Sequence, residues 1–326
     1  MAKKKIKLAL IGCGGNMRNA HIPRIQADGK VELVGVADPV EEQAQLLMEK
    51  WGSEVPWFTD YKRMIRETAP DAIAISSPHS MHYEQASHCL RKGLHVLIEK
   101  PLTTTSSHAK SLIRLSEKQK RLLVVSYQRH FLAPHTYARE LIQKGELGEI
   151  RGIVSYVTQN WSNISGWRLV PELSGGGMFM DTGSHLVAAT LWITGLQPAE
   201  VSAFLNNADK DVDINTVVSI RFENGAVGTL NTFGNASRHD ERIAIHGSKG
   251  CLVFHLHQWG IKSVLLNDEP LKLPNRIRES SPDAEFFKWI RNGGKGYESP
   301  NFALQVSRLT EAVYKSVEQK KPVKVR

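Results

Sequence analysis

The sequence predicts an α/β fold in which a doubly wound parallel sheet is followed by an α+β domain with a large, mostly antiparallel open sheet. Up to residue 127, short β-branched apolar runs alternate with amphipathic helical stretches, which is typical of βαβ units. From residue 128 onwards, strands of alternating apolar and polar residues are separated by Asn-Gly, Lys-Gly and Asn-Asp turns, which indicates antiparallel pairing. A chain of 326 residues is long enough for two domains, and the boundary is expected at 127/128.

Five strands, with helices between them, are expected in the first domain. The strands are predicted at 6–12, 31–39, 71–78, 94–101 and 122–128, and the helices at 19–28, 40–52, 60–70, 81–93 and 106–120. Several of these strands are apolar on both faces, so helices should cover both sides of the sheet.

The second domain is expected to hold longer strands and three helices. Strand patterns lie at 149–161, 199–207, 214–235, 241–257 and 262–273, and helical patterns at 136–148, from 181 onwards and at 301–321. The last helix has an apolar face and is a candidate to pack back on the first domain. No repeat, low-complexity tract or flexible linker interrupts the chain, so closely apposed domains are expected.

Composition argues against several classes of protein. The net charge is +9, but much of the excess lies near the chain ends and in helix-like stretches without a reader motif, so no nucleic-acid partner is expected. No apolar run approaches the roughly 18 residues of a membrane span, and the basic start is not followed by a signal-peptide cleavage site. The three cysteines are far apart, so a reducing cytoplasm is the expected location.

The first predicted strand runs into a glycine loop. Gly12 permits a tight turn, and Gly14 lets the backbone approach a pyrophosphate at the start of the next helix. Met17 occupies the third glycine position, and one extra residue precedes His21, so the loop alone is a weak sign of dinucleotide binding.

The end of the second strand strengthens this interpretation. Asp38 stands where a carboxylate can accept both ribose hydroxyls of an adenosine. Pro39 follows and no arginine is adjacent, so nothing obvious would bind a 2′-phosphate. NAD is therefore expected rather than NADP.

The stretch "GLHVLIEKPL", residues 93–102, ends a buried strand with an acid, a base and a proline. Ligands of open α/β sheets bind at the carboxyl ends of strands, so Lys100 is a candidate to hold a substrate hydroxyl and stabilise a developing oxyanion. Taken alone, Glu99 and Lys100 could equally form a surface salt bridge beside a proline turn.

The stretch "SGGGMFMDTGSH", residues 174–185, offers a proton acceptor. Its run of three glycines, 175–177, allows close approach to a ligand or to a neighbouring backbone. Asp181 and His185 are four residues apart at the start of a helix, so both side chains can point one way. A histidine suits proton transfer near neutral pH, and a carboxylate beside it can position it or the lysine. The alternative is an N-capping Asp181 and a structural His185.

Nearly the whole chain resembles the family of glucose-fructose oxidoreductase, inositol dehydrogenase and MocA-type oxidoreductases, abbreviated Gfo/Idh/MocA. The similar segments are 11–21, 36–39, 71–102, 127–150, 167–185 and 247–254, and the EKP tripeptide with the GGG-to-DxxxH segment is specific. The resemblance implies a dinucleotide-binding Rossmann domain in residues 1–127 and a domain for substrate binding and oligomerisation in residues 128–326. It also implies an NAD-dependent dehydrogenase or reductase acting on CH–OH groups of a sugar, inositol or related polyol.

The same resemblance implies roles for individual residues. His185 would accept the hydroxyl proton, Lys100 would polarise that oxygen, and Asp181 would order the pair. The substrate would contact these three residues and also Trp161 and Arg168, with Trp167 on the same side. Cofactor contacts are implied for Gly12, Gly14, Asn16, Met17, Asp38, Ser77, Pro78, His82, Glu99, Lys100 and Gln128.

Two pairs of histidines do not support a metal site. His79 and His82 lie where the cofactor is expected, and His255 and His257 share a strand face without a nearby cysteine or acid. No metal is therefore expected. One face of the antiparallel sheet should remain free of helices, and in the family such a face commonly packs on another subunit, so a homodimer or homotetramer through this sheet is expected.

Two other functions stay open on the sequence. An NAD-dependent glycosidase would use the same residues to oxidise a sugar hydroxyl transiently, eliminate the aglycone and return the hydride. A non-catalytic sensor that binds dinucleotide would not need Lys100 and His185, and this chain has both.

Overall fold

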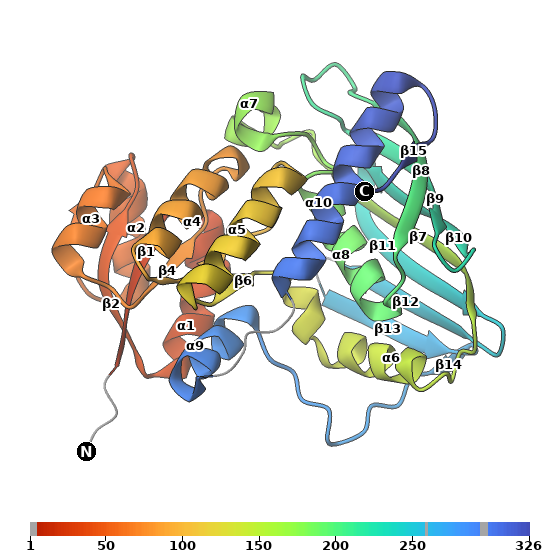
Figure 1. Cartoon of the computed structure of the whole chain (residues 1–326), viewed down its shortest axis with the longest axis horizontal. Coiled ribbons are helices and arrows are strands. Elements are labelled where there is room, and N and C mark those ends of the chain that lie inside the picture. Colours follow the sequence, from red (N-terminus) through yellow and green to blue (C-terminus); the bar gives the residue numbers. More distant parts are fainter. Residues whose placement is uncertain (1–4, 258–259, 294–298) are drawn as a thin grey trace. The chain divides into compact units, whose positions relative to one another are not determined.

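The computed structural model describes residues 5–257, 260–293 and 299–326. The chain forms two compact units (Figure 1). The first unit comprises the chain up to Thr103 together with Ser107–Ser126 and Ser280–Asn301. The second comprises Thr104–Ser106, Tyr127–Glu279 and Phe302–Arg326.

The first unit is built on a parallel sheet, as expected, but with six strands rather than five, in the order β3-β2-β1-β4-β5-β6. Its strands are β1 (Ile6–Ile11), β2 (Val31–Ala37), β3 (Trp57–Phe58), β4 (Ala72–Ile75), β5 (His95–Ile98) and β6 (Leu123–Val125). The order reverses at β1, which pairs with β2 on one side and β4 on the other, and such a switch point is where these sheets bind ligands. The edge strand β3 was not predicted, because two residues are too short to show a period.

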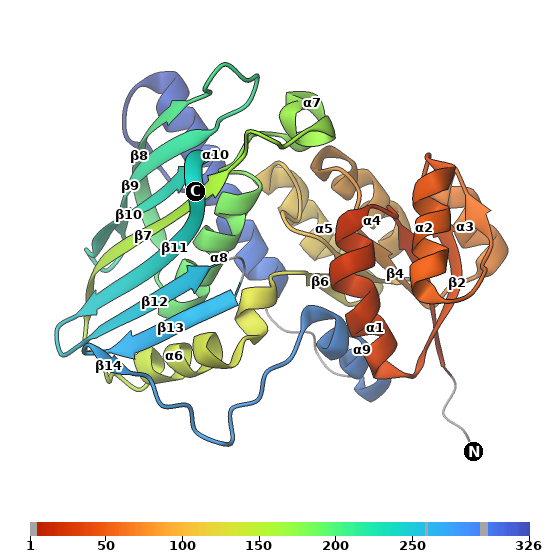
Figure 2. The ribbon, with the colours of Figure 1, turned by 180° about the vertical axis from the view of Figure 1, so that it is seen from behind.

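Helices cover both faces of this sheet. One face packs against α1 (Ile22–Asp28), α2 (Glu41–Trp51) and α9 (Pro282–Asn292) through a single apolar core, and Figure 2 shows α1 and α9 in front. The opposite face is covered by α3 (Tyr61–Thr68), α4 (His82–Arg91) and α5 (Ser106–Gln119), seen in Figure 1. The double covering confirms the expectation drawn from the apolar strands, since every residue of β4 and β6 is buried.

Helix α9 was not predicted, although its start carries ordinary helix signals. The Ser281 hydroxyl accepts a hydrogen bond from the Ala284 N–H, and Pro282 stands at the first helical position. The sequence instead favoured the last helix, α10 (Ser299–Gln319), as the one that returns to the first unit. From Phe302 onwards α10 belongs to the second unit, and α9 is the helix that returns.

The second unit is built on a nine-stranded sheet with the order β14-β13-β12-β11-β7-β10-β9-β8-β15. All neighbours pair antiparallel except β7 and β10, so the expected mostly antiparallel sheet is confirmed. The strands are β7 (Ile150–Asn160), β8 (Pro198–Asn206), β9 (Asn215–Phe222), β10 (Val227–Phe233), β11 (Asn235–Gly247), β12 (Cys251–His257), β13 (Gly260–Leu266), β14 (Glu269–Pro270) and β15 (Val323–Lys324).

Helices of the second unit lie on one side of this sheet. The helix α8 (Thr182–Thr194) is buried along its whole length and packs on β7, β10 and β11. It is flanked by α6 (Ala133–Gln143) and α10, while the short α7 (Pro171–Ser174) precedes it in the chain. On the other side, in the part of the chain that the structure describes, no helix covers the sheet (Figure 1). We call this the outer face.

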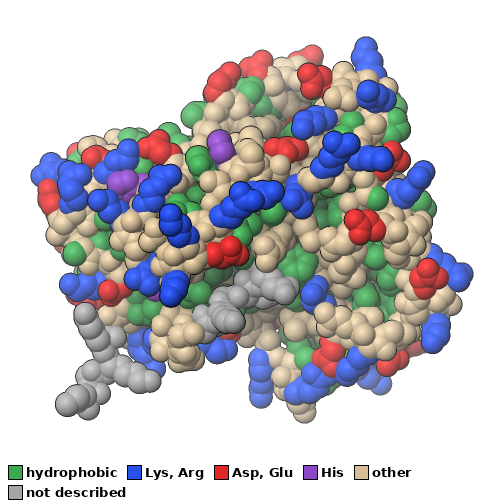
Figure 3. Space-filling view, in the orientation of Figure 1, with side chains coloured by type: hydrophobic (Ala, Val, Ile, Leu, Met, Phe, Trp, Pro, Cys, Tyr) green, Lys and Arg blue, Asp and Glu red, His purple; other side chains and the backbone are tan. Residues whose placement is uncertain are grey.

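Surface charge, helix length and the grouping of possible metal ligands bear on nucleic-acid, membrane and metal binding. On the side drawn in Figure 3, lysine and arginine side chains are spread over the surface with acidic side chains among them. None of the helices among the described residues combines the length and the apolar character needed to cross a bilayer. In the same residues no three His, Cys, Asp or Glu side chains gather in a group that could hold a metal ion. All three cysteines are free thiols.

Candidate functional site

The two glycines of the loop after β1 stand in different surroundings. Gly12 has a φ of +85°, and a Cβ there would lie 2.6 Å from the carbonyl oxygen of Ser76. A Cβ on Gly14 would meet nothing within 4 Å. Gly12 is therefore required by the fold itself, whereas the space beside Gly14 is open to a ligand. An open backbone at the amino end of a helix fits the pyrophosphate of a dinucleotide.

The Asp38 carboxylate organises the same loop. Its Oδ2 accepts a hydrogen bond of 2.7 Å from the Cys13 N–H, and its Oδ1 accepts one of 2.9 Å from the Val40 N–H. Each oxygen keeps a second lone pair, so the carboxylate can still accept ribose hydroxyls. Arg18 donates to the Cys13 carbonyl at 2.6 Å and to Gln43 Oε1 at 2.7 Å. The residues present therefore fit NAD, and the charge of Asp38 disfavours the 2′-phosphate of NADP.

Met17, which stands at the third glycine position, faces the core. Its side chain is fully buried in the apolar cluster of the first unit, so only its backbone remains for a ligand. The Ile22 N–H donates to the Met17 carbonyl, which makes Met17–His21 a π-helical turn. Such a turn holds one residue more than an α-helical one, and this accommodates the extra residue of the loop. Asn16, just before it, donates to Ser76 Oγ at 3.3 Å.

The turn after β4 is held by side chains that were expected along the cofactor. The Ser77 hydroxyl donates to Gln85 Oε1 at 2.5 Å. His82 is fully buried, and its two ring nitrogens lie 2.8 Å from the Pro101 carbonyl oxygen and 3.0 Å from that of Ser77. Burial lowers the pKa of His82. The ring of His82 joins the turn after β4 to the turn after β5, and its contact with the cofactor stays a prediction.

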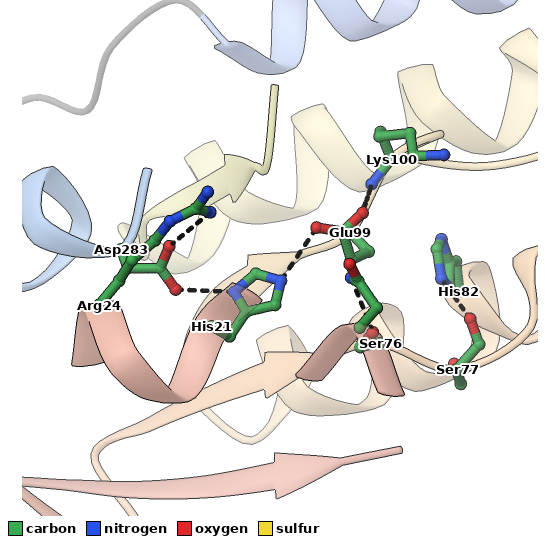
Figure 4. A network of polar contacts seen from close by, with 9 residues as sticks. His21, Arg24, Ser76, Ser77, His82, Glu99, Lys100 and Asp283 are labelled. Carbon is green, nitrogen blue, oxygen red and sulfur yellow. Dashed lines mark hydrogen bonds and ion pairs between the residues drawn. The ribbon is translucent and has the colours of Figure 1, made fainter. Parts of the chain in front are cut away.

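Glu99 and Lys100 follow β5 directly, and neither is at the surface. The Glu99 side chain is 13% exposed and Lys100 is 9% exposed, which argues against the surface salt bridge that the sequence left open. The Lys100 N–H donates to Glu99 Oε2 at 3.3 Å, and the Lys100–Pro101 peptide bond is cis. Figure 4 shows the Lys100 side chain pointing away from His21, toward which Glu99 is turned.

His21 connects Glu99 to a residue far along the chain. Its Nε2 lies 2.9 Å from Glu99 Oε1 and its Nδ1 lies 2.7 Å from Asp283 Oδ1, while Arg24 Nη1 lies 3.6 Å from Asp283 Oδ2. Burial lowers the pKa of His21, but the charges of Asp283 and Glu99 and their hydrogen bonds outweigh it and raise the pKa to about 10. Each ring nitrogen faces a carboxylate oxygen, and an ionised carboxylate can only accept a hydrogen bond, so these contacts favour the protonated ring. We call Glu99, His21, Asp283 and Arg24 the His21 network.

In the second unit, Asp181 stands at the N-cap position of α8 without capping it. No side-chain hydrogen bond joins Asp181 to the first turn of the helix. Its Oδ2 instead accepts a hydrogen bond of 2.7 Å from Arg168 Nε, and the Arg168 guanidinium lies 4.5 Å from the centre of the Trp167 ring. The alternative in which Asp181 is only a cap is therefore wrong. His185, one turn further along α8, is 6% exposed.

The glycine run before α8 serves close packing of the backbone. A Cβ on Gly177 would overlap the backbone of Asp213. The Asp213 carboxylate accepts hydrogen bonds from the Gly177 N–H at 2.7 Å, the Phe179 N–H at 2.9 Å and the Tyr314 hydroxyl at 2.7 Å. The sequence left open whether these glycines allow the approach of a ligand or of a neighbouring backbone. At Gly177 the structure shows a neighbouring backbone. Asp213 was not predicted, because nothing in its own stretch of sequence marks it as the partner of a segment 36 residues away.

Gln159, at the end of β7, ties two neighbouring segments together and was also not predicted. Its Oε1 accepts a hydrogen bond from Trp161 Nε1 and another from the Thr182 hydroxyl, both of 3.0 Å. Trp161 is thereby held to the first residue of α8. Two predicted residues remain: Gln128 is half-buried in a short helical turn that follows β6, and Pro78 stands directly before the short helical turn His79–Met81.

Most of the predicted residues fall into two groups, one in each unit, whereas Gln128, predicted to contact the cofactor, belongs to the second unit. The first group lies at the carboxyl ends of neighbouring parallel strands and includes Gly12, Gly14, Asp38, Ser77, Glu99 and Lys100. The second group is joined by hydrogen bonds around the start of α8 and includes Trp161, Arg168 and Asp181, with His185 one turn on. His21, Gln159, Asp213 and Asp283 are the supporting residues that sequence reasoning missed.

Two family models match the chain. Residues 6–127 match the NAD-binding Rossmann fold of an oxidoreductase family, and residues 135–253 match the GFO/IDH/MocA C-terminal domain. The chain is 31% identical to D-glucoside 3-dehydrogenase of Escherichia coli over 201 residues, which cover 60% of this chain and 56% of that protein. It thus spans little more than half of that relative's length.

Two further comparisons extend over more of the chain. It is 26% identical to dTDP-3,4-didehydro-2,6-dideoxy-alpha-D-glucose 3-reductase of Saccharopolyspora spinosa, over 77% of this chain and 75% of that one. The fold matches the WlbA dehydrogenase from Bordetella pertussis, solved with NADH and UDP-GlcNAcA, with a TM-score of 0.85 and 22% identity over 100% of this chain and 99% of that one. With both domain models matched in order along one chain, this protein belongs to the Gfo/Idh/MocA family of oxidoreductases, and its first unit is the NAD-binding Rossmann domain of that family.

Proposed function

We propose that the protein transfers hydride between a secondary alcohol of a sugar or related polyol and the nicotinamide of NAD. The observation that carries the proposal is a nearly buried lysine, Lys100, at the carboxyl end of a strand in the unit that also holds the open backbone at Gly14 and the carboxylate of Asp38. A lysine in that position can act on an oxygen of a molecule bound beside the nicotinamide.

The proposal gives each polar residue one task. When bound, NAD⁺ supplies the acceptor for the hydride that leaves the alcohol carbon. Lys100 donates a hydrogen bond to the alcohol oxygen and stabilises the negative charge that grows there. His185 accepts the hydroxyl proton, and Asp181, held by Arg168 at 2.7 Å, orders the two. Lys100 belongs to the first unit and the other three to the second, so their joint action on one carbon is itself part of the proposal.

The names of the relatives support a sugar as the substrate. One relative is named a D-glucoside 3-dehydrogenase and another a 3-reductase of a dTDP-linked glucose derivative, so both names refer to carbon 3 of a glucose-type ring. A secondary ring alcohol is the group that these two names share. We therefore propose a pyranose or pyranoside, with carbon 3 as the first position to examine.

A survey of substrates with NAD tests this function. The purified protein is mixed with NAD and with methyl glucosides, free aldoses, anhydrosugars and inositols, and the absorbance of NADH is followed. The proposal expects stoichiometric NADH with one class of sugar and turnover lowered by about 10²-fold or more in K100A and H185A, both of which still bind NAD. NAD binding without NADH from any sugar would contradict it, and release of an aglycone without net NADH would favour a glycosidase.

We also propose that the outer face of the nine-stranded sheet joins two copies of the chain. Phe204 and Val217 are paired across β8 and β9, and they are 78% and 38% exposed. On the same sheet Val154 and Val227 are exposed beside a groove of about 720 Å³. An apolar surface of this kind on a sheet is more typical of a protein interface than of a surface facing water. A homodimer or homotetramer through this face is the expected assembly.

A further inference from the structure

The turn between the glycine loop and α1 directs the side chain of His21 into the interior of the first unit. The π-helical turn Met17–His21 places His21 with only 1% of its side chain exposed. Its two partners, Glu99 and Asp283, are also almost entirely removed from water, at 13% and 0% exposure. A buried cation between two carboxylates is costly to desolvate, and it is kept only where its contacts are well made. None of the steps proposed above uses it.

The partners of His21 come from three distant parts of the first unit. Glu99 follows β5, His21 precedes α1, and Asp283 belongs to α9, which the chain adds 262 residues after His21. Figure 4 shows Asp283, His21 and Glu99 in one line that ends beside Lys100. Glu99 also contacts the backbone of Lys100, because its second carboxylate oxygen accepts a hydrogen bond of 3.3 Å from the Lys100 N–H.

The geometry of a strand links Glu99 to the direction of Lys100. Successive side chains of an extended chain leave it on opposite sides. The Glu99 N–H still bonds to the Ile75 carbonyl of β4 at 2.9 Å, so the backbone at this point continues the sheet. With the Glu99 side chain fixed toward His21, the Lys100 side chain is directed the other way, as Figure 4 shows.

From these contacts we propose that His21 and Asp283 are positioning residues for Lys100: His21, held by Asp283, fixes the Glu99 side chain and through it the orientation of Lys100. The inference rests on the proposed function only for the consequence in catalysis, since the orientation of Lys100 is a property of the first unit alone. Helix α9 is then part of the catalytic apparatus through one carboxylate, although it follows most of the second unit in the chain.

Another ion pair, between Asp28 and Arg291, also joins α1 to α9 and provides a matched control. Asp28 of α1 accepts two hydrogen bonds from Arg291 of α9, of 2.7 and 2.8 Å, and this pair makes no contact with Glu99. D28N therefore weakens the attachment of α9 to α1 without changing the His21 network. D283N changes the network by replacing a single charged oxygen.

The test measures the chemical reactivity of Lys100 in the full-length protein, which requires no substrate. Wild type, D283N and D28N are treated briefly with acetic anhydride, and acetylation of the Lys100-containing peptide is followed by mass spectrometry, with melting temperatures measured in parallel. Acetylation of Lys100 is expected to become about tenfold faster in D283N, because the charge-assisted hydrogen bond between His21 and Asp283 is lost. In D28N the rate of acetylation should stay unchanged. With the sugar that gives turnover, kcat should fall in D283N alone while KM for NAD stays the same.

Equal acetylation of Lys100 in D283N and wild type, or an equal increase in D283N and D28N, would overturn the inference and leave the His21 network a structural attachment of α9. If D283N does not fold, E99Q takes its place, because it keeps the contacts of Asp283 with His21 and Arg24 and the Asp28–Arg291 pair, and changes only the group next to Lys100. Absence of turnover with every sugar would count against the proposed function, whereas the acetylation result would still decide the role of His21.

Discussion

Gly12 and Gly14 are two residues apart, yet substitution of each should have a different consequence. G12A puts a Cβ against the Ser76 carbonyl at a φ of +85° and should lower the melting temperature. G14A adds a Cβ in open space, so the melting temperature should stay unchanged while the affinity for NAD falls by about tenfold or more. Thermal unfolding and calorimetric titration with NAD check both. Unchanged NAD binding in G14A would contradict the placement of the pyrophosphate.

Asp181 should matter for turnover and not for the binding of NAD. Its carboxylate accepts the Arg168 hydrogen bond and does not cap α8, so D181N removes a charge without removing a cap. We expect kcat to fall by about 10²-fold with KM for NAD unchanged. D240N is the control, because Asp240 accepts a hydrogen bond from Tyr156 on neighbouring strands. A D181N enzyme as active as D240N would exclude Asp181 from the catalytic group.

At the scale of elements, the free energy that the contact between His21, directly before α1, and Asp283 of α9 contributes to folding should depend on pH. The pKa of His21 is raised from 6.5 to about 10 by Asp283 and Glu99 against the effect of burial, and the Arg24 guanidinium lies 3.6 Å from Asp283. Because the folded pKa lies above the unfolded one, the stabilisation is complete below pH 6.5 and is lost as the pH rises through about 10.

The corresponding measurement compares the free energy of unfolding of wild type and H21Q in urea across this range of pH. The difference should be about 3–5 kcal/mol near neutral pH, as for other broken buried ion pairs, and should shrink toward pH 10. N16Q serves as control, since Asn16 precedes the same turn but lies outside the network. A difference that is constant with pH would mean that His21 is uncharged in the folded protein.

The elements also show what could be predicted from the sequence. Five of the six strands of the parallel sheet, α8 and the segments around Lys100 and Asp181 have strong local patterns, and these elements formed where expected. The supporting residues depend on partners far along the chain. Asp283 meets His21 across 262 residues and Asp213 meets Gly177 across 36, and no local period encodes such pairs. Met17 illustrates a further limit, because a π-helical turn changes which residue faces the core.

At the scale of the whole molecule, the assembly should depend on the outer face of the large sheet. Replacing Val154 and Val227 by lysine places like charges where two copies are proposed to meet, so the assembly should dissociate to monomers with little change in melting temperature. Light scattering of wild type and the double variant measures this directly. The pair K62Q and R63Q, on the exposed surface of α3, is the control. A wild-type monomer, or a variant that stays associated, would exclude this face as the interface.

The central claim is that hydride passes from a sugar carbon to NAD, and an isotope experiment tests it most directly. The sugar found active in the survey is prepared with deuterium on the carbon that is oxidised, beginning with carbon 3 of a methyl glucoside, and the products are analysed by mass spectrometry. The account predicts one deuterium in each NADH formed and an equal amount of keto sugar. Deuterium that remains on a sugar whose aglycone has been released, or that appears in the solvent, would contradict it.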